Sequence, residues 1–305
     1  MKTCQSTASS VAGYPESRRK EPYYHASPSE PSSCMSSAGD LGSASTLQSC
    51  HQNWTEAIAS IAKDVPGGVV LRRGGVTIVH SGLSITAFNC AFVLDPPRTL
   101  TGVEKEIAGA LARHPQPWCL ISTEENRRAI GPIVEALRLQ PRDVLPGMIW
   151  EPLPRPSHSA PQELEIRRVR DAEDLRIFGR TMMEGFDAPL ALMAPWVAGI
   201  LSKGSLRPTR RSLYLGLVKN RPVCTAIRFT TNRVAGIYGV STIPEFRRRG
   251  FGAAITRRAV LDGGEEGCER SYLQSSKMGR SVYESLGYRT SEEYVLWLPE
   301  GPTKR

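Results

Sequence analysis

The segment 240–254 holds the residues whose types and spacing come nearest to a chemical site. A predicted strand ends there, the pattern Arg247-x-x-Gly250-x-Gly252 follows in a turn, and a predicted helix begins at once. The first turn of a helix presents unpaired backbone N–H groups and the positive end of the helix dipole. Glycines allow a phosphate to approach the main chain, and arginines add positive charge. The segment therefore predicts a pyrophosphate site on residues 248–253.

Taken alone, this turn leaves other interpretations open. Residues 247–249 are also typical of a solvated run of arginines, and such a short pattern often occurs by chance. A dinucleotide site is disfavoured, because the spacing is not G-x-G-x-x-G and no acidic residue follows a second strand about 20 positions on. A Walker loop is excluded, because Gly-Lys-Ser/Thr is missing.

The surrounding sequence predicts an α/β unit over residues 162–305. Runs rich in β-branched and aromatic residues predict strands, and apolar residues at helical spacing predict helices. The expected strands cover residues 164–169, 212–218, 222–231, 234–242, 271–275 and 294–298, and the expected helices cover 171–185, 189–201, 251–262 and 277–286. Asp171 opens the first of these helices, and Gly263 and Gly264 are expected to end the third.

Residues 51–151 repeat part of this order. Strands are expected at 69–71, 77–80, 87–94, 118–122 and 147–150, and helices at 103–113 and 129–139. The ends of the two blocks also resemble each other, with Val134-Glu-Ala-Leu-Arg-Leu in one and Tyr283-Glu-Ser-Leu-Gly-Tyr in the other. Either an internal duplication or a chance match explains this likeness.

The composition divides the chain of 305 residues, a length that allows about two domains. Residues 1–50 contain 13 serines and few large apolar side chains, so we expect a disordered tail or an extension upstream of the true start. The Pro-rich residues 152–161 are expected to link a first domain, 51–151, to a second domain, 162–305.

Composition and charge argue against several classes of protein. Hydrophobic residues make up 40% of the chain, yet no apolar run approaches the roughly 20 residues of a membrane span. Seven widely spaced cysteines, none in a C-x-x-C pair, argue against a zinc site and a disulfide framework and favour the cytoplasm. Residues 161–305 hold 24 basic and 16 acidic side chains, which is most of the net charge of +9. Such a field attracts nucleic acid, an anionic membrane or an anionic small molecule.

Residues 164–298 resemble the GNAT superfamily of acetyl-CoA-dependent N-acetyltransferases. The likeness rests on two motifs in the family's order, Val240-x-Thr-x-Pro with the arginine–glycine turn, and Lys277-Met-Gly-Arg-Ser-Val-Tyr-Glu-Ser-Leu-Gly-Tyr288. The resemblance implies an α/β (α+β) fold, in which a mixed, twisted sheet is splayed in its middle and flanked by helices. It also implies acetyl-CoA as co-substrate in the split, an amine-bearing acceptor and no metal.

The resemblance further implies roles for residues of this chain. Main-chain N–H groups of the turn would bind the pyrophosphate, and the end of the preceding strand would pair with the pantetheine arm. Tyr283 would protonate the departing thiolate, a task suited to a phenol, unless it is only a packed helix aromatic. The residues expected to bind the coenzyme are Val240, Thr242, Arg247, Arg248, Arg249, Gly250, Phe251, Gly252, Ala253 and Ser276, the last in place of an asparagine common in the family.

The general base is less well defined by the sequence. An amine must lose a proton before or during its attack on a thioester. Residues 161–305 contain no histidine, and residues 233–244 contain no carboxylate. Glu184 is the preferred base, and Asp187, Tyr238 acting through water, and water alone are the alternatives.

The leading hypothesis is an enzyme that transfers an acetyl group from acetyl-CoA to a primary amine by direct attack in a ternary complex. A non-catalytic acyl-CoA sensor or interaction module is the alternative. Nucleic-acid binding ranks below both, because the arginines are not interleaved with aromatics in any recognised module. The turn 95–102 of the first block has two prolines and one glycine, so that block is expected to be a degenerate GNAT-like unit that shapes the acceptor site.

Overall fold

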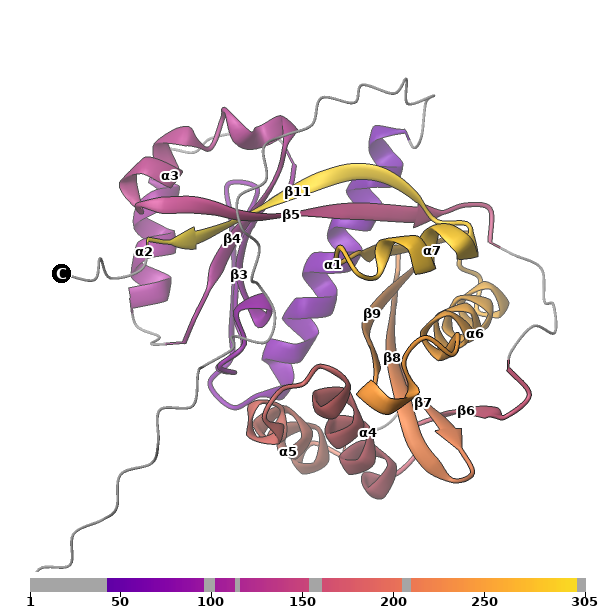
Figure 1. Ribbon diagram of the computed structural model, residues 1–305. Coiled ribbons are helices and arrows are strands. Elements are labelled where there is room, and N and C mark those ends of the chain that lie inside the picture. The colour runs from indigo at the N-terminus through magenta and orange to yellow at the C-terminus, as the bar shows by residue number, and fades with distance from the viewer. Residues whose placement is uncertain (1–42, 96–101, 113–115, 154–160, 205–209, 301–305) are drawn as a thin grey trace, which may run out of the picture.

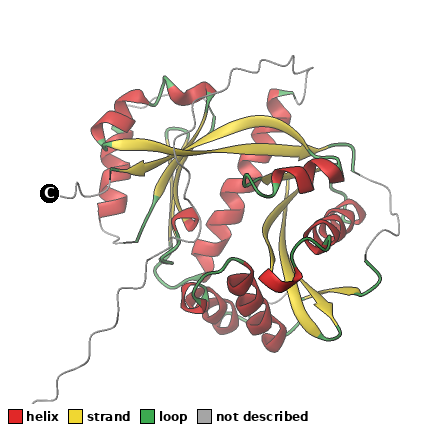
Figure 2. Ribbon diagram, viewed as in Figure 1, coloured by secondary structure: helices red, strands yellow, loops and turns green. Residues whose placement is uncertain are grey.

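The computed structural model describes residues 43–95, 102–112, 116–153, 161–204 and 210–300. Most of the predicted tail, most of the predicted linker and most of the turn 95–102 therefore lie outside the described residues. The described residues form one mixed sheet of 11 strands with helices on both faces (Figures 1 and 2). This architecture agrees with the expected α/β class.

The elements follow in chain order. The helices are α1 (Ala44–Asp64), α2 (Val103–Ala112), α3 (Gly131–Ala136), α4 (Ala172–Gly185), α5 (Ala194–Ser202), α6 (Phe251–Glu265) and α7 (Arg280–Leu286). The strands are β1 (Val69–Arg73), β2 (Val76–His80), β3 (Asn89–Val93), β4 (Cys119–Thr123), β5 (Leu139–Trp150), β6 (Leu164–Arg168), β7 (Arg211–Val218), β8 (Arg221–Thr231), β9 (Val234–Thr242), β10 (Arg270–Gln274) and β11 (Arg289–Pro299).

The sheet has the strand order β1-β2-β3-β4-β11-β5-β10-β9-β8-β7-β6. Neighbours are antiparallel except β3 with β4 and β9 with β10, which are parallel. A parallel pair needs a crossover connection, and helices α2 and α6 supply it. The two halves of the chain therefore repeat the same strand–helix–strand connection.

β5 and β11 exchange places between the two halves. β5, from the first half, lies between β10 and β11, with Gly147 opposite Gln274. β11, from the end of the chain, lies between β5 and β4, with Leu296 opposite Ile121. Figure 1 shows these two long strands side by side across the middle of the molecule. Residues 152–161 thus separate the halves in sequence but not in the sheet.

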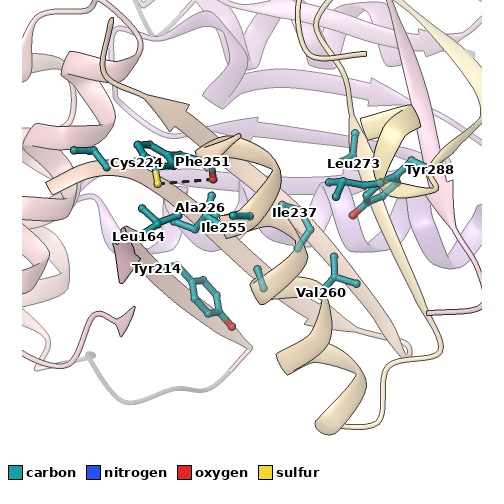
Figure 3. Close-up of a cluster of buried hydrophobic side chains, with 14 of the residues drawn as sticks. Leu164, Tyr214, Cys224, Ala226, Ile237, Phe251, Ile255, Val260, Leu273 and Tyr288 are labelled. Carbon is teal, nitrogen blue, oxygen red and sulfur yellow. Dashed lines mark hydrogen bonds between the residues drawn. The ribbon is translucent and has the colours of Figure 1, made fainter. Parts of the chain in front are cut away.

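Alternate residues of each strand fill cores on opposite faces of the sheet. Tyr214 of β7 packs with Ile255 of α6, in the core that Figure 3 shows. Its neighbours Leu213 and Leu215 pack instead with Phe178 of α4, on the other face. The sheet around β8 and β9 is therefore covered on both faces.

The elements expected from the sequence do not include α1, which begins at Ala44. Residues 44–50 are therefore helical rather than part of the Ser-rich tail, and Cys50 is fully buried. Asn53 of α1 donates hydrogen bonds to the carbonyl oxygens of Phe229 at 2.9 Å and Val234 at 3.1 Å, which ties the helix to the second half. Trp54, Ile58 and Ile61 nevertheless follow helical spacing on the buried face of α1, so the sequence carries the apolar pattern of a helix here and the expectation missed it.

Several element bounds also differ from the expected ones. Gly263 lies inside α6 instead of ending it. A Cβ at Gly263 would be only 2.8 Å from the Cβ of Ala235, so the glycine is needed for the helix to pack closely on β9. The expected helix 189–201 is divided into a short 3-10 helix, Leu190–Leu192, and α5, which has a proline in its first turn. β5 and β11 begin earlier than expected, because they pair with each other along most of their lengths.

Candidate active site

The predicted phosphate turn joins the end of β9 to the first turn of α6. Gly250, directly before α6, has a φ of 78°, a left-handed conformation that glycine adopts without strain. The N–H of Ala254 donates to the carbonyl oxygen of Gly250 at 3.0 Å. The N–H groups of residues 251–253 therefore belong to the first turn, where they have no acceptor within the helix. This end of α6 is suited to bind an anion.

β9 and β10 separate beside this turn. The last parallel pair is Tyr272 with Gly236, although β9 continues to Thr242 and β10 to Gln274. β9 also contains a bulge where its register against β8 shifts, and such a bulge increases the local twist. Residues 240–242 therefore have no partner on β10, and the sheet is split there.

The open edge of β9 and the first turn of α6 face each other across Gly252. A Cβ at Gly252 would lie 3.7 Å from Oγ1 of Thr242 and 4.0 Å from Cγ1 of Val240. Both of these side chains are half-buried. The structure thus brings together the residues expected to cradle a pyrophosphate and those expected to pair with a pantetheine arm.

Arg247 connects the turn to two other elements. Its Nε donates to the carbonyl oxygen of Thr242 at 3.1 Å, and its Nη2 donates to the carbonyl oxygen of Gly185 at 2.9 Å. Gly185 is the last residue of α4. Arg247 therefore braces the turn against the end of β9 and the end of α4.

Arg249 and Arg248 have different surroundings from each other. Arg249 forms an ion pair with Glu163 at 2.6 Å, and its guanidinium lies over the rings of Phe246 and Phe251. Arg248 is exposed and has a φ of 62°, which is uncommon for a residue with a side chain. Arg249 therefore stabilises the turn by packing, while Arg248 is open to solvent and to an anion.

Tyr283 and Ser276 lie in and before α7. Tyr283 is half-buried in the same core as Val240 and Ala253, and its ring meets Tyr288 edge-on at 5.8 Å. Burial raises the pKa of Tyr283 to about 12, so the phenol is protonated at neutral pH. The Oγ of Ser276 accepts a hydrogen bond from the N–H of Gly279 at 3.2 Å, and Ser276 therefore shapes the turn before α7.

The three side chains considered as the general base differ in their exposure and in their hydrogen bonding. Glu184 and Asp187 are exposed near the end of α4. Tyr238 donates its hydroxyl to Oδ1 of Asn53 at 2.7 Å, and burial raises its pKa well above the ordinary value. The Tyr238 hydroxyl is therefore already hydrogen-bonded to α1, which makes it poorly placed to accept a proton through water.

A group that the sequence does not predict lies at the centre of the sheet. His51 of α1 is buried, with Nδ1 3.0 Å from Oδ1 of Asp95 and Nε2 2.8 Å from Oε2 of Glu292. Burial alone lowers the pKa of His51, but the hydrogen bonds to Asp95 and Glu292 outweigh it and raise the pKa to about 9. The three residues come from α1, the end of β3 and β11, and only the exchange of strands brings them together.

A hollow of about 280 Å³ lies in the first half, between α1, the β1–β2 turn and the end of β3. His51, Asp95, Arg72 and Phe92 are among its lining residues, whereas none of the expected coenzyme-binding residues is. Within the described ranges, no cluster of His, Cys, Asp and Glu is arranged to hold a metal ion. No helix in the described part of the chain is both long and apolar enough to cross a membrane.

Solved structures named as GCN5-related N-acetyltransferases share the fold of this chain. Residues 214–298 match the family model described as FR47-like protein. A GCN5-related N-acetyltransferase from Kribbella flavida superposes with a TM-score of 0.60 at 18% identity, over 82% of this chain and 96% of that chain. Another from Sphaerobacter thermophilus superposes with a TM-score of 0.53 at 17% identity, over 75% of each chain.

The comparison with curated proteins finds no match. The predicted GNAT fold and the predicted resemblance to the GNAT superfamily are nevertheless confirmed by the family model and the solved structures. The family model covers the turn, α6 and α7, which are the elements that carry both motifs.

Proposed function

We propose that the chain is an N-acetyltransferase that transfers an acetyl group from acetyl-CoA to a primary amine by direct attack in a ternary complex. The observation that carries this proposal is the split between β9 and β10 beside the first turn of α6. Two structures of the same fold are named as acetyltransferases, which supports the reaction class.

The residues at the split fit acetyl-CoA. Its pyrophosphate would bind the N–H groups of residues 251–253 and the exposed Arg248, because a helix N-terminus and an arginine both favour phosphate. Its pantetheine arm would hydrogen-bond to the backbone of Val240 and Thr242, which β10 leaves unpaired. Gly252 keeps the space between these two parts open.

The chemistry follows from these positions. The amine nitrogen attacks the thioester carbonyl carbon, and a backbone N–H of residues 240–242 would stabilise the negative charge on the carbonyl oxygen. The carbon–sulfur bond then breaks, and the departing thiolate takes a proton from the phenol of Tyr283. Tyr283 is protonated at neutral pH, so its proton is available when the thiolate forms.

We also propose that residues 51–151 are a degenerate second GNAT-like unit and residues 162–305 the catalytic one. The repeated strand–helix–strand connection and the exchange of β5 and β11 support an internal duplication. The five cysteines of the described residues are buried and free, which supports a reducing compartment such as the cytoplasm.

The test is release of CoA from acetyl-CoA by the full chain, with 2-phenylethylamine, spermidine, glucosamine and a lysine peptide as acceptors. We expect release above background with at least one amine and an acetylated product by mass spectrometry. The proposal would be contradicted if the protein did not bind acetyl-CoA and released no CoA with any of these amines.

A non-catalytic acyl-CoA sensor is the second candidate. It is favoured by β9, which carries neither a carboxylate nor a histidine, and by the exposure of Glu184 and Asp187. A sensor would bind acetyl-CoA but release no CoA with any of the four amines. The same assay therefore separates the two candidates.

A further inference from the structure

We propose that the ring of Tyr238 closes the end of the split between β9 and β10 and limits the acyl group of the coenzyme to short chains such as acetyl and propionyl. This inference rests on the proposed function, and it names the class of acyl donor that the site accepts. It also gives helix α1, which holds Tyr238 in place, a part in the site.

The acyl group of a bound coenzyme would lie next to Tyr238. The pyrophosphate is assigned to the first turn of α6, which follows the end of β9 in the chain. The pantetheine arm therefore runs back along β9, from Thr242 to Val240, and carries the thioester toward the residues before Val240. These residues are Gly239 and Tyr238, and successive residues of a strand lie only about 3.3 Å apart. The acyl chain is thus directed at the closed end of the split.

The ring of Tyr238 covers the last position at which β9 pairs with β10. That position is Gly236, opposite Tyr272. A Cβ at Gly236 would be 2.6 Å from the hydroxyl oxygen of Tyr238 and 2.7 Å from its Cε2. The ring is therefore folded back along its own strand, over a glycine that leaves room for it.

Helix α1 fixes the ring in this position. The hydroxyl of Tyr238 donates to Oδ1 of Asn53 at 2.7 Å, and Nδ2 of Asn53 donates to the carbonyl oxygens of Phe229 and Val234. Asn53 is fully buried, and both hydrogens of its amide are used, so its orientation is fixed. The ring of Tyr238 also packs against two buried clusters, one under α1 and one under α4. It cannot swing aside without breaking these contacts.

Side chains of α4 and β8 fill the space beside the bulge of β9. Gly239 in this bulge has a φ of 56°, and a Cβ there would be 3.2 Å from Sδ of Met182 and 3.0 Å from Cδ1 of Ile227. Met182 and Ile227 are buried in the cluster under α4 against which Tyr238 packs. A long acyl chain would have to displace Tyr238, Met182 or Ile227, and a packed interior resists such added methylenes.

The test measures binding of acetyl-CoA, propionyl-CoA and octanoyl-CoA to the full chain by calorimetric titration. Binding requires no acceptor amine, so the unidentified acceptor does not enter the result. We expect the wild type to bind octanoyl-CoA at least about tenfold more weakly than acetyl-CoA, and propionyl-CoA within about threefold of acetyl-CoA.

Variants of Tyr238 test whether its ring sets this limit. Tyr238→Val removes the ring and keeps a residue suited to a strand, and we expect it to bind octanoyl-CoA within about threefold of acetyl-CoA. Tyr238→Phe keeps the ring and should still discriminate at least about tenfold. Thermal unfolding without ligand shows whether each variant is folded, and Tyr238→Leu, which removes less volume, takes the place of Tyr238→Val if that variant is not.

Phe92→Val is the matched control. It also removes a ring from the core under α1, but Phe92 lies on β3, and β4, β11, β5 and β10 separate that strand from the split. Because distant sites act independently, Phe92→Val should keep the wild-type preference for acetyl-CoA over octanoyl-CoA.

The outcomes separate this inference from the proposed function. A wild type that binds none of the three acyl-CoAs overturns the proposed function itself. A wild type that binds octanoyl-CoA as tightly as acetyl-CoA, or more tightly, overturns the role of Tyr238 alone. The same conclusion follows if a folded Tyr238→Val or Tyr238→Leu still excludes octanoyl-CoA, or if Phe92→Val gains it equally.

Discussion

Arg247 donates a hydrogen bond from Nη2 to the carbonyl oxygen of Gly185 at 2.9 Å, and this bond joins the phosphate turn to the end of α4. The same guanidinium holds the last carbonyl of β9, that of Thr242. One side chain therefore fixes the strand, the turn and the helix that border the split. The shape of the proposed acetyl-CoA site therefore depends on Arg247.

We predict that Arg247→Ala weakens acetyl-CoA binding about tenfold, because a charged hydrogen bond is worth about 1.5 kcal/mol and the turn loses its brace. Calorimetric titration of the full chain measures this directly. Arg233→Ala, at the opposite end of β9, is the matched control and keeps the wild-type affinity. Equal affinities for the wild type and both variants would refute the role of Arg247.

Tyr283→Phe is expected to lower turnover about 100-fold and to leave acetyl-CoA affinity unchanged. Burial of the ring is kept, and within the described residues the hydroxyl makes no hydrogen bond, so stability changes little. Steady-state rates of CoA release, with thermal unfolding as the control, test this. Full turnover in the phenylalanine variant would mean that Tyr283 only packs.

The stability of the protein should decline between pH 6.5 and pH 9 because of His51. The pKa of His51 is about 9 in the folded protein against 6.5 in an unfolded chain. A raised pKa stabilises the fold fully below pH 6.5, and that contribution, roughly 3 kcal/mol, is lost as the pH rises through 9.

Urea unfolding of the wild type and of His51→Gln at pH 6.5 and pH 8.5 checks this expectation. The wild type should lose its advantage over the variant across this range, whereas groups common to both proteins cancel. A constant difference between the two proteins would contradict the raised pKa.

Asp262→Asn should destabilise the protein by about 3 kcal/mol at neutral pH. The buried Asp262 carboxylate accepts hydrogen bonds from Arg258 at 2.7 Å, Arg168 at 2.9 Å and Tyr214 at 3.0 Å. Burial raises its pKa, but the two arginines outweigh burial and lower it. The loss should therefore shrink at acidic pH, where the wild-type carboxyl is also neutral.

Denaturant unfolding of Asp262→Asn against Glu265→Gln, an exposed carboxylate of the same helix, measures the effect. The control variant should stay within about 0.5 kcal/mol of the wild type. A similar loss in both variants would show that the buried network adds nothing specific.

The turn before α6 was predictable from sequence because its residues are consecutive. The strand end, the arginines, Gly250 and the helix start are read from one short segment, and local chemistry decides their structure. The same local rules wrongly end α6 at Gly263. This glycine instead lacks a side chain because the helix packs closely against Ala235 on a distant strand.

The group around His51 was not predictable for the opposite reason. His51 and Glu292 are separated by most of the chain, and they meet only because β11 lies between β4 and β5. No periodicity within α1 or β11 specifies that pairing. Dividing the sequence into two blocks also obscures this contact, because each block contains only one of the two residues.

The most direct test of the central claim is thermal unfolding of the full chain with and without acetyl-CoA, for the wild type and for Gly252→Val. The added side chain would point toward Thr242 and Val240, into the space assigned to the coenzyme. At about 100 times the dissociation constant, ligand adds about 2.7 kcal/mol, or roughly 5–10 °C. We predict this shift in the wild type and its loss in Gly252→Val. An unmoved wild-type transition, or an equal shift in both proteins, would contradict the account.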